Sequence, residues 1–234
     1  MSMRHTIKPT GWYVQTYRLV GLCYRCQVSP TPVTPKGAAT RAFLLQTAAE
    51  VFAERGYAET TMAELIARSG LTKGAFYFHF SSKEQLALAV IEEKQRQWVD
   101  SVQATINAAA PAIDQLRAVA LALVRVHRED PSAFSVSRLT RDLSRVPEVS
   151  DAVCTHTRAW VDMVAGLVKQ AQADENLPST IAAHDLAALL VAATDGLKDL
   201  GGLIDTPTRA RRAFERRMTA LVTLVDALSI ANSS

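Results

Sequence analysis

The fold is decided by the stretch Thr61-Met-Ala-Glu-Leu-Ile-Ala-Arg-Ser-Gly-Leu-Thr-Lys-Gly-Ala-Phe-Tyr-Phe-His-Phe80, which predicts two short helices joined by a tight turn. Thr61 and Glu64 stand at capping-box spacing, so each side chain is expected to accept the backbone N–H of the other residue. Gly70 provides the positive φ expected just past a helix end. These signals predict a helix-turn-helix, an arrangement suited to a DNA groove.

The second helix of this hairpin has an inward and an outward face. Thr72 is placed to cap the helix, and Phe76 and Phe80, four residues apart, are expected to face inward. The outward face carries a cation, a phenol and an imidazole, all of which donate hydrogen bonds to phosphates: Lys73, Tyr77 and His79.

Gly74 lies within this second helix, where glycine costs about 1 kcal/mol relative to alanine. A close approach of the helix backbone to DNA explains that cost. The alternative is a small helical hairpin with ordinary surface residues. It fits less well, because so many aromatic side chains on one short helix make a poor surface.

Residues 40 to about 84 resemble the amino-terminal domain of the TetR family of transcriptional repressors. Four signals fall in the family's order: an opening helix over residues 40–57, the pair Thr60-Thr61, the hairpin, and Ser81-Ser-Lys-Glu84. The resemblance implies an all-α fold with an amino-terminal three-helix helix-turn-helix domain. It also implies a carboxy-terminal helical bundle for ligand binding and dimerisation.

The resemblance assigns DNA contact to seven positions, which are Thr61, Thr72, Lys73, Gly74, Tyr77, His79 and Lys83. In the family the first helix supports the hairpin, and an apolar face is available for this role: Phe43, Leu44, Ala48, Val51 and Phe52. Ser81 and Glu84 repeat the capping-box spacing, which places Lys83 in the first turn of the next helix.

A second resemblance concerns Lys73-Gly-Ala-Phe-Tyr-Phe-His-Phe80 and the following Ser82-Lys-Glu-Gln-Leu-Ala87. This wording is similar to that of the γ-butyrolactone receptors of filamentous actinobacteria. The similarity implies a small amphipathic effector of the γ-butyrolactone class.

Length and composition are those of a small regulator. The 234 residues can form one small DNA-binding domain and one larger helical domain. No run of about 18 apolar residues occurs, so no membrane span is expected. An odd number of cysteines, three, and the lack of a secretory leader favour a reducing cytoplasm, where the protein would associate with the nucleoid.

Residues 1–36 form a basic leader without acidic residues, and their aromatic residues follow no helical or strand period. Two interpretations are open: a basic arm that binds phosphates or a minor groove, and a disordered leader, which we favour. Cys23 and Cys26 have the spacing of a zinc pair. No second pair follows nearby, so no metal site is expected.

Beyond Lys83 the apolar periodicity predicts successive helices, over residues 83–109, 111–128, 132–143, 147–174, 181–203 and from 206 onward. The predicted organisation is therefore a leader (1–36), a helix-turn-helix domain (37–84) and a helical ligand-binding and dimerisation domain (85–230).

The final helix carries an apolar stripe spaced four, three, four and three residues apart: Phe214, Met218, Leu221, Val225 and Leu228. Such a stripe suits a four-helix dimer interface. The alternative is burial of the stripe within one subunit. The TetR resemblance favours the interface, because members of that family dimerise through their last two helices.

One helix further back, His156, Trp160 and Met163 share an apolar face and are candidates for lining a ligand cavity. Trp160 also resembles the tryptophan that lies over the pocket in γ-butyrolactone receptors. For His156 the competing interpretation is a core histidine with its hydrogen bonds satisfied.

Catalysis has little support in this sequence. Asp151, Cys154 and His156 suggest a cysteine-nucleophile cluster, but Cys154 and His156 are two residues apart and on a helix point nearly opposite ways. No phosphate-binding glycine loop or nucleophile elbow occurs, and no cofactor is expected.

The sequence therefore predicts a homodimeric, ligand-responsive regulator, a repressor rather than an activator. It would bind double-stranded, pseudo-palindromic operator DNA and be released by a small amphipathic or hydrophobic effector. The alternative is an architectural or effector-independent DNA-binding protein, which would need no apolar cavity in its bundle.

Overall fold

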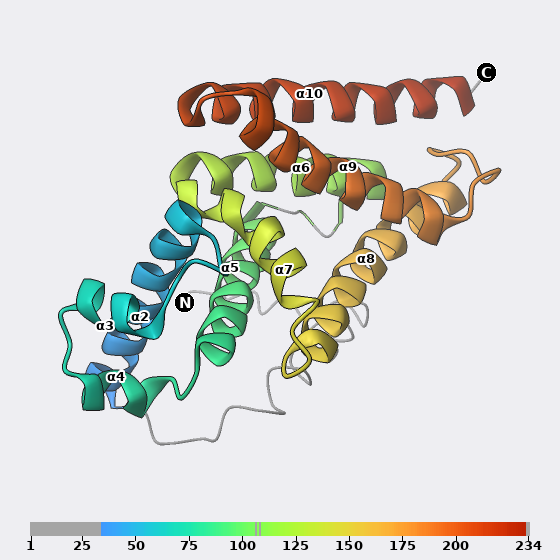
Figure 1. Cartoon of the computed structure of the whole chain (residues 1–234). Coiled ribbons are helices and arrows are strands. Elements are labelled where there is room, and N and C mark those ends of the chain that lie inside the picture. Colours follow the sequence, from blue (N-terminus) through green and yellow to red (C-terminus); the bar gives the residue numbers. More distant parts are fainter. Residues whose placement is uncertain (1–33, 106, 108, 233–234) are drawn as a thin grey trace, which may run out of the picture.

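The computed structural model describes residues 34–105, 107 and 109–232, and within these ranges all regular structure is helical (Figure 1). The helices are α2 (Pro35–Arg55), α3 (Met62–Ser69), α4 (Lys73–His79), α5 (Lys83–Thr105), α6 (Ala112–Glu129), the 3-10 turn η1 (Pro131–Ser135), α7 (Val136–Leu143), α8 (Ser150–Ala173), α9 (Ala183–Ile204) and α10 (Pro207–Asn232). The predicted all-α class is confirmed. The leader, residues 1–33, lies outside the described residues.

The chain forms two parts that share α5. Helices α2, α3 and α4, here called the head, gather at one end of the molecule, and α9 and α10 cross at the opposite end (Figure 1). Helices α5 to α10, here called the bundle, make up the remainder. None of the described helices has the length and apolar character required to cross a membrane.

Local capping sets the helices of the head. The Thr61 hydroxyl accepts the amide N–H of Glu64 at 3.2 Å, and the Thr72 hydroxyl accepts that of Ala75 at 3.2 Å. Gly70 ends α3 in the left-handed conformation, with φ of 66°. Both predicted caps and the glycine stop are confirmed.

Two details of the predicted capping are wrong. The Glu64 carboxylate does not close a capping box; it forms an ion pair with Arg55 at 2.7 Å. At the start of α5 the cap is shifted by one residue, because the Ser82 hydroxyl, rather than that of Ser81, accepts the N–H of Gln85 at 3.2 Å.

Helix α2 begins earlier than the sequence predicted. Thr34 caps it by accepting the N–H of Gly37 at 3.1 Å, and Pro35 occupies the first turn, where its missing N–H costs nothing. Residues 34–36, which the sequence assigned to the leader, therefore form the cap and the first residues of this helix.

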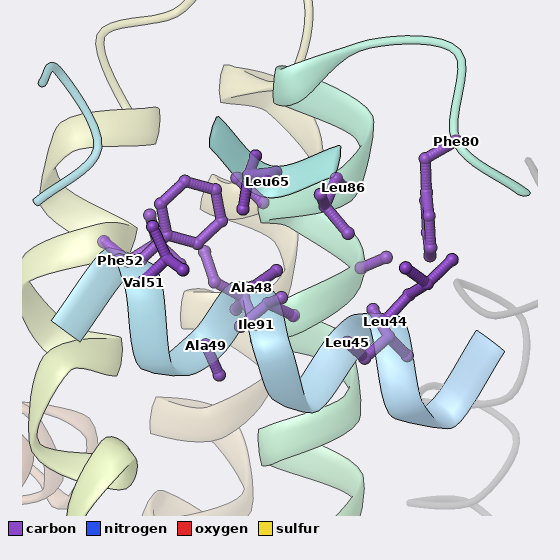
Figure 2. Packing of buried hydrophobic residues seen from close by; sticks show 14 of the residues in the cluster. Leu44, Leu45, Ala48, Ala49, Val51, Phe52, Leu65, Phe80, Leu86 and Ile91 are labelled. Carbon is purple, nitrogen blue, oxygen red and sulfur yellow. The ribbon is translucent and has the colours of Figure 1, made fainter. Parts of the chain in front are cut away.

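The core of the head lies between α2, α3 and α5 (Figure 2), and it continues to buried residues of α7 and α8, among them Leu143 and Val153. Ala48 and Phe52 on α2 pack with Leu65 on α3 and with Leu86 and Ile91 on α5, and all five are buried. One predicted member of this face was wrong, because Phe43 is 50% exposed.

Phe76 and Phe80 join the same core from α4 and the turn that follows it, at 1% and 3% exposure. The predicted inward face of α4 is therefore confirmed. Two buried rings anchor α4 and leave the other side of this short helix to solvent.

The helix boundaries in the bundle differ from the prediction mainly at prolines. The helix expected over residues 132–143 is divided into η1 and α7, because Asp130 caps a 3-10 turn by accepting the Ser132 N–H at 2.9 Å. Helix α8 begins at Ser150 rather than at Pro147.

A buried lysine joins the head to the bundle. Lys94 on α5 is 7% exposed; its Nζ donates to Gln46 Oε1 on α2 at 2.9 Å and pairs with Asp130 at the end of α6. Burial opposes the charged form of Asp130, but hydrogen bonds from Lys94 and Ser132 outweigh it, and the pKa of this carboxyl lies below its usual value. We call Gln46, Lys94, Asp130 and Ser132 the joint.

His127 on α6 is buried at 4% exposure, against the rings of Phe134 and Phe214. Its Nδ1 lies 2.7 Å from the Leu123 carbonyl oxygen, and within the described part of the chain Nε2 has no hydrogen-bond partner. Burial, reinforced by the positive charge of Lys198, lowers the pKa of His127 to about 4. The side chain is therefore neutral near pH 7.

This buried imidazole predicts a loss of stability in mild acid. The unfolded chain takes up the proton near pH 6.5 and the folded chain only near pH 4, so the free energy of unfolding should fall as pH drops through that window. The expected loss is on the order of 3 kcal/mol. Urea denaturation at pH 7 and pH 4.5 should show a smaller difference for His127→Leu, whereas His184→Gln, a change at an exposed histidine, should keep the wild-type difference.

Candidate nucleic-acid interface and effector cavity

The exposed side of α4 is free of acidic residues. Lys73, Gly74, Tyr77 and Phe78 face solvent there, and no Asp or Glu occurs anywhere from Leu71 to Lys83. The Lys73 ammonium lies 6.0 Å from the centroid of the Tyr77 ring, at the far limit of a cation–π contact. The surface thus presents a cation, a phenol and a bare backbone position without negative charge to repel a phosphate.

His79 lies on this surface as a neutral group rather than as a cation. Burial, and then the nearby positive charge of Arg41, lower its pKa below the usual value for histidine. Arg41 itself stacks over the Phe80 ring at 4.4 Å. His79 therefore offers a neutral N–H donor near pH 7, and the full cationic charge on α4 is carried by Lys73.

Lys83 is engaged inside the head. Its Nζ donates to the carbonyl oxygens of Tyr57 at 3.0 Å and Thr60 at 2.9 Å, and it lies 4.3 Å from the centroid of the Tyr57 ring. The Tyr57 hydroxyl in turn donates to Glu84 at 2.8 Å. Lys83 ties the entry of α3 to the start of α5, a structural role that its sequence position did not reveal.

Thr61 and Thr72 are exposed at the first turns of α3 and α4. Their hydroxyls accept backbone N–H groups of those turns, and the remaining N–H groups at a helix start favour anions. Six of the seven predicted DNA-contact residues lie on α4 or cap α3 and α4, and Lys83 is the first residue of α5. The seven differ in availability, because Lys83 already has partners within the chain.

Sequence reasoning missed Phe78, whose side chain is 74% exposed. The signal was present in the spacing: Phe76 and Phe80 point inward, and a residue midway between them on a helix points outward. The inward and outward faces predicted for this helix did not include Phe78.

The bundle contains a cavity of about 60 Å³ between α6, α8, α9 and α10. Its walls are almost entirely apolar and include Leu123, Trp160, Val164, Leu190, Met218 and Val225. Arg117 lies at the cavity and forms ion pairs with Asp226 at 2.8 Å and with Asp114. Trp160 also contacts Trp98 edge to face, at 4.1 Å between ring centroids.

The three candidate ligand-binding residues do not share this cavity. Trp160 lines it, but His156 and Met163 are not among its walls. The His156 Nε2 lies 3.3 Å from Glu92 Oε1 on α5, which gives the imidazole a partner within the chain. The polar residues among the cavity walls are Arg117 and Thr194, neither of which the sequence singled out.

The predicted interface stripe on α10 is mostly internal, which is a correction. Phe214 and Met218 are 1% and 2% exposed within a single subunit, where they pack with Leu123. Leu221 and Val225 line the cavity. Leu221 and Val225 are partly exposed, and Leu228 is the most exposed of the five, at 39%. The stripe faces α6, because α10 covers that helix rather than turning its most apolar side outward.

A different apolar surface is exposed on the last two helices. Large side chains are open to solvent on both: Leu189, Leu200, Leu203 and Ile204 on α9, and Leu224 and Leu228 on α10. Gly196 lies among them on α9, and a Cβ placed on it would meet nothing within 4 Å. We call these residues the outer apolar face.

No cluster of metal-binding side chains occurs among the residues that the structure describes. Cys154 is a free, partly buried thiol on α8. The Cys23 and Cys26 pair lies outside the described residues.

Comparison with known proteins agrees with this architecture. Residues 44–90 match the model of the bacterial regulatory proteins of the TetR family. The HTH-type transcriptional activator FasR of Mycolicibacterium smegmatis is 30% identical over 151 residues, which cover 64% of this chain and 68% of FasR.

One further relative matches over a short stretch, and one solved structure matches over most of the chain. The A-factor receptor protein of Streptomyces griseus is 43% identical over 51 residues, which are 22% of this chain and 18% of that protein. The crystal structure of a γ-butyrolactone receptor described as ArpA-like matches with a TM-score of 0.60 at 22% identity, and covers 83% of this chain and 96% of the receptor. That likeness shows a shared fold.

The family model covers most of α2, all of α3 and α4 and the start of α5, and FasR is by its name a regulator of transcription. On this match of sequence and fold, the chain belongs to the TetR family of bacterial transcriptional regulators.

Proposed function

We propose that this protein is a homodimeric repressor that binds a pseudo-palindromic operator and is released by a small amphipathic effector. The observation that carries the proposal is the solvent-facing side of α4, which presents Lys73 and Tyr77 within an acid-free stretch. Repression is proposed because occupancy of an operator is sufficient for it. Residues 37–84 would serve as the DNA-binding domain and residues 85–230 as the effector and dimer domain.

The phosphates of DNA would be bound by the Lys73 ammonium together with the backbone N–H groups at the start of α4. Lys73 stands at the beginning of α4, exposed, next to the N–H groups of a capped first turn. A helix start and a lysine both favour a phosphate, and the α4 side chains beyond them would face base edges in the major groove. Two such heads would occupy grooves about one helical turn, 34–36 Å, apart.

Replacement of Lys73 tests DNA contact. Lys73→Met should weaken binding to specific and nonspecific duplexes alike, and should lower the slope of log affinity against log salt by about one unit. Fluorescence anisotropy over a range of salt concentrations measures both. Lys169→Met, a change at an exposed lysine on α8, is the matched control and should leave the slope unchanged. An unaltered slope for Lys73→Met would remove this residue from the interface.

The outer apolar face supports dimerisation with a second copy of the chain. Leu203 and Leu224 are 82% and 64% exposed, which is costly for two adjacent helices of an isolated subunit. Gly196 leaves room for a partner helix to approach closely. A face made by two adjacent helices becomes self-complementary about a two-fold axis and buries these leucines in a four-helix contact.

A charge on this face should separate the subunits. Leu224→Arg would bury a cation without a partner in the dimer, while the same side chain is mostly exposed in the monomer. We expect folded monomers in sedimentation velocity at micromolar concentration, together with weaker operator binding. Leu121→Arg is the matched control, since Leu121 is 62% exposed on α6, away from the outer apolar face, and should leave the dimer intact. A monomeric wild-type protein would contradict the proposal.

The cavity supports an effector with an apolar body and a polar end. Its walls offer apolar contact, and Arg117 offers donors at its side. The space of about 60 Å³ is smaller than a cavity of about 150 Å³ that accommodates benzene. An acylated lactone would therefore have to move the surrounding helices, and this movement would give the effector different affinities for two conformations. A purely architectural protein has no need of such a cavity.

Trp160 provides the readout for this proposal. Addition of a γ-butyrolactone with a hydrocarbon chain should change tryptophan fluorescence and weaken operator binding together, by about 5- to 150-fold. Trp160→Phe should blunt both effects and keep operator affinity without the lactone. His156→Gln, a change outside the cavity walls, should respond as the wild type does. Operator release without any difference between these variants would place the effector elsewhere.

A further inference from the structure

Phe78 is an exposed aromatic residue that the contacts described above do not explain. Its side chain is 74% exposed in the last turn of α4. Leaving a phenylalanine in water forgoes roughly 1.5–3 kcal/mol of burial. A partner outside the chain that covers the ring would recover this free energy.

The packing of α4 fixes the direction of Phe78. Phe76 and Phe80 are buried on either side of it in the sequence, so residue 78 projects directly away from the core of the head. The His79 ring meets the Phe78 ring edge to face, with 5.2 Å between their centroids. This contact supports the ring without covering it.

Gly74 lies one turn before Phe78 on the same side of α4. A Cβ placed on Gly74 would meet nothing within 4 Å, so packing inside the chain does not require glycine there. On the surface of α4 the backbone is therefore uncovered at Gly74, and the exposed ring of Phe78 lies next to it. A planar group of a ligand that packs on the backbone at Gly74 would also contact the Phe78 ring.

The residues around Gly74 and Phe78 favour a ligand that carries both negative charges and apolar groups. The stretch from Leu71 to Lys83 contains no acidic residue, and Lys73 is exposed on the same helix. In the major groove of DNA the apolar group that differs between bases is the 5-methyl of thymine, and phenylalanine is one of the side chains that contact it.

We propose that Phe78 reads a thymine in each half-site of the operator, through contact of its exposed ring with the 5-methyl group. The inference rests on the proposed function, because it requires α4 to enter the major groove. The thymine contact would give the DNA-binding surface its sequence specificity. Lys73 would bind the phosphate backbone of DNA whatever its sequence, and Phe78 would distinguish thymine from the other bases.

The test removes the methyl group and nothing else. A duplex is first selected from a randomised pool by the wild-type protein, and each thymine in it is then replaced by deoxyuridine, which keeps the base pair. At one position in each half-site, wild-type affinity should fall about fourfold, the equivalent of one buried methyl group, and roughly fifteenfold when both are changed.

The protein variants assign that loss to one ring. Phe78→Ala should bind the thymine and deoxyuridine duplexes equally well, and low salt brings its weaker binding into a measurable range. Phe43→Ala is the matched control, because Phe43 is 50% exposed on α2, outside α4, and this variant should keep the fourfold difference.

Four results would overturn the inference. A selected duplex without thymine in its half-sites, or one in which no deoxyuridine weakens binding, leaves Phe78 without its contact while the proposed function stands. An equal fourfold loss in Phe78→Ala assigns the methyl contact to another residue. A wild-type protein that selects no duplex at all overturns the proposed function and the inference together. A change in sedimentation for Phe78→Ala identifies a second copy of the chain as the partner of the ring instead.

Discussion

The structure depends on α5 belonging to two cores at once. Near its start, Leu86, Val90 and Ile91 complete the core of the head. Two turns later Trp98 and Val102 pack into the bundle. A rigid helix anchored at both ends leaves the two parts little freedom to move independently, because displacing either end would open a cavity in one of the cores. The orientation of α4 is therefore set by how the bundle holds α5.

Much of the head could be predicted, since its signals are local. A threonine three residues before an amide that needs an acceptor, a glycine at a left-handed position and two phenylalanines four residues apart each act within one or two turns of helix. The structure confirms these at Thr61, Gly70 and the pair Phe76 and Phe80. Local chemistry also misleads where a distant partner competes, as Arg55 does for the carboxylate of Glu64.

The bundle was harder to predict because periodicity tells which side of a helix is apolar and not what will cover it. Phe214 and Met218 follow the spacing of an interface, yet α6 covers them within the subunit. The exposed Leu203 and Leu224 follow a glycine and a threonine, so the apolar periodicity around them is weaker than that of the buried stripe on α10. His156 likewise shares a face with Trp160, but a glutamate brought close by folding, 64 residues away in sequence, takes its Nε2. Such contacts require the tertiary arrangement.

The joint has a consequence for the exchange of DNA-binding heads between members of this fold. In a chimera of two such proteins that is joined in the turn before α5, Lys94 and Asp130 would come from one protein. The residue at position 46 would come from the other. An apolar residue at that position would leave the buried Lys94 ammonium without the 2.9 Å contact to Gln46 Oε1. A buried charge that loses a partner keeps its desolvation penalty, so the loss commonly costs more free energy than the contact itself contributes. A chimera should therefore carry Gln46 and Lys94 as a single inherited unit, even though 48 residues separate them.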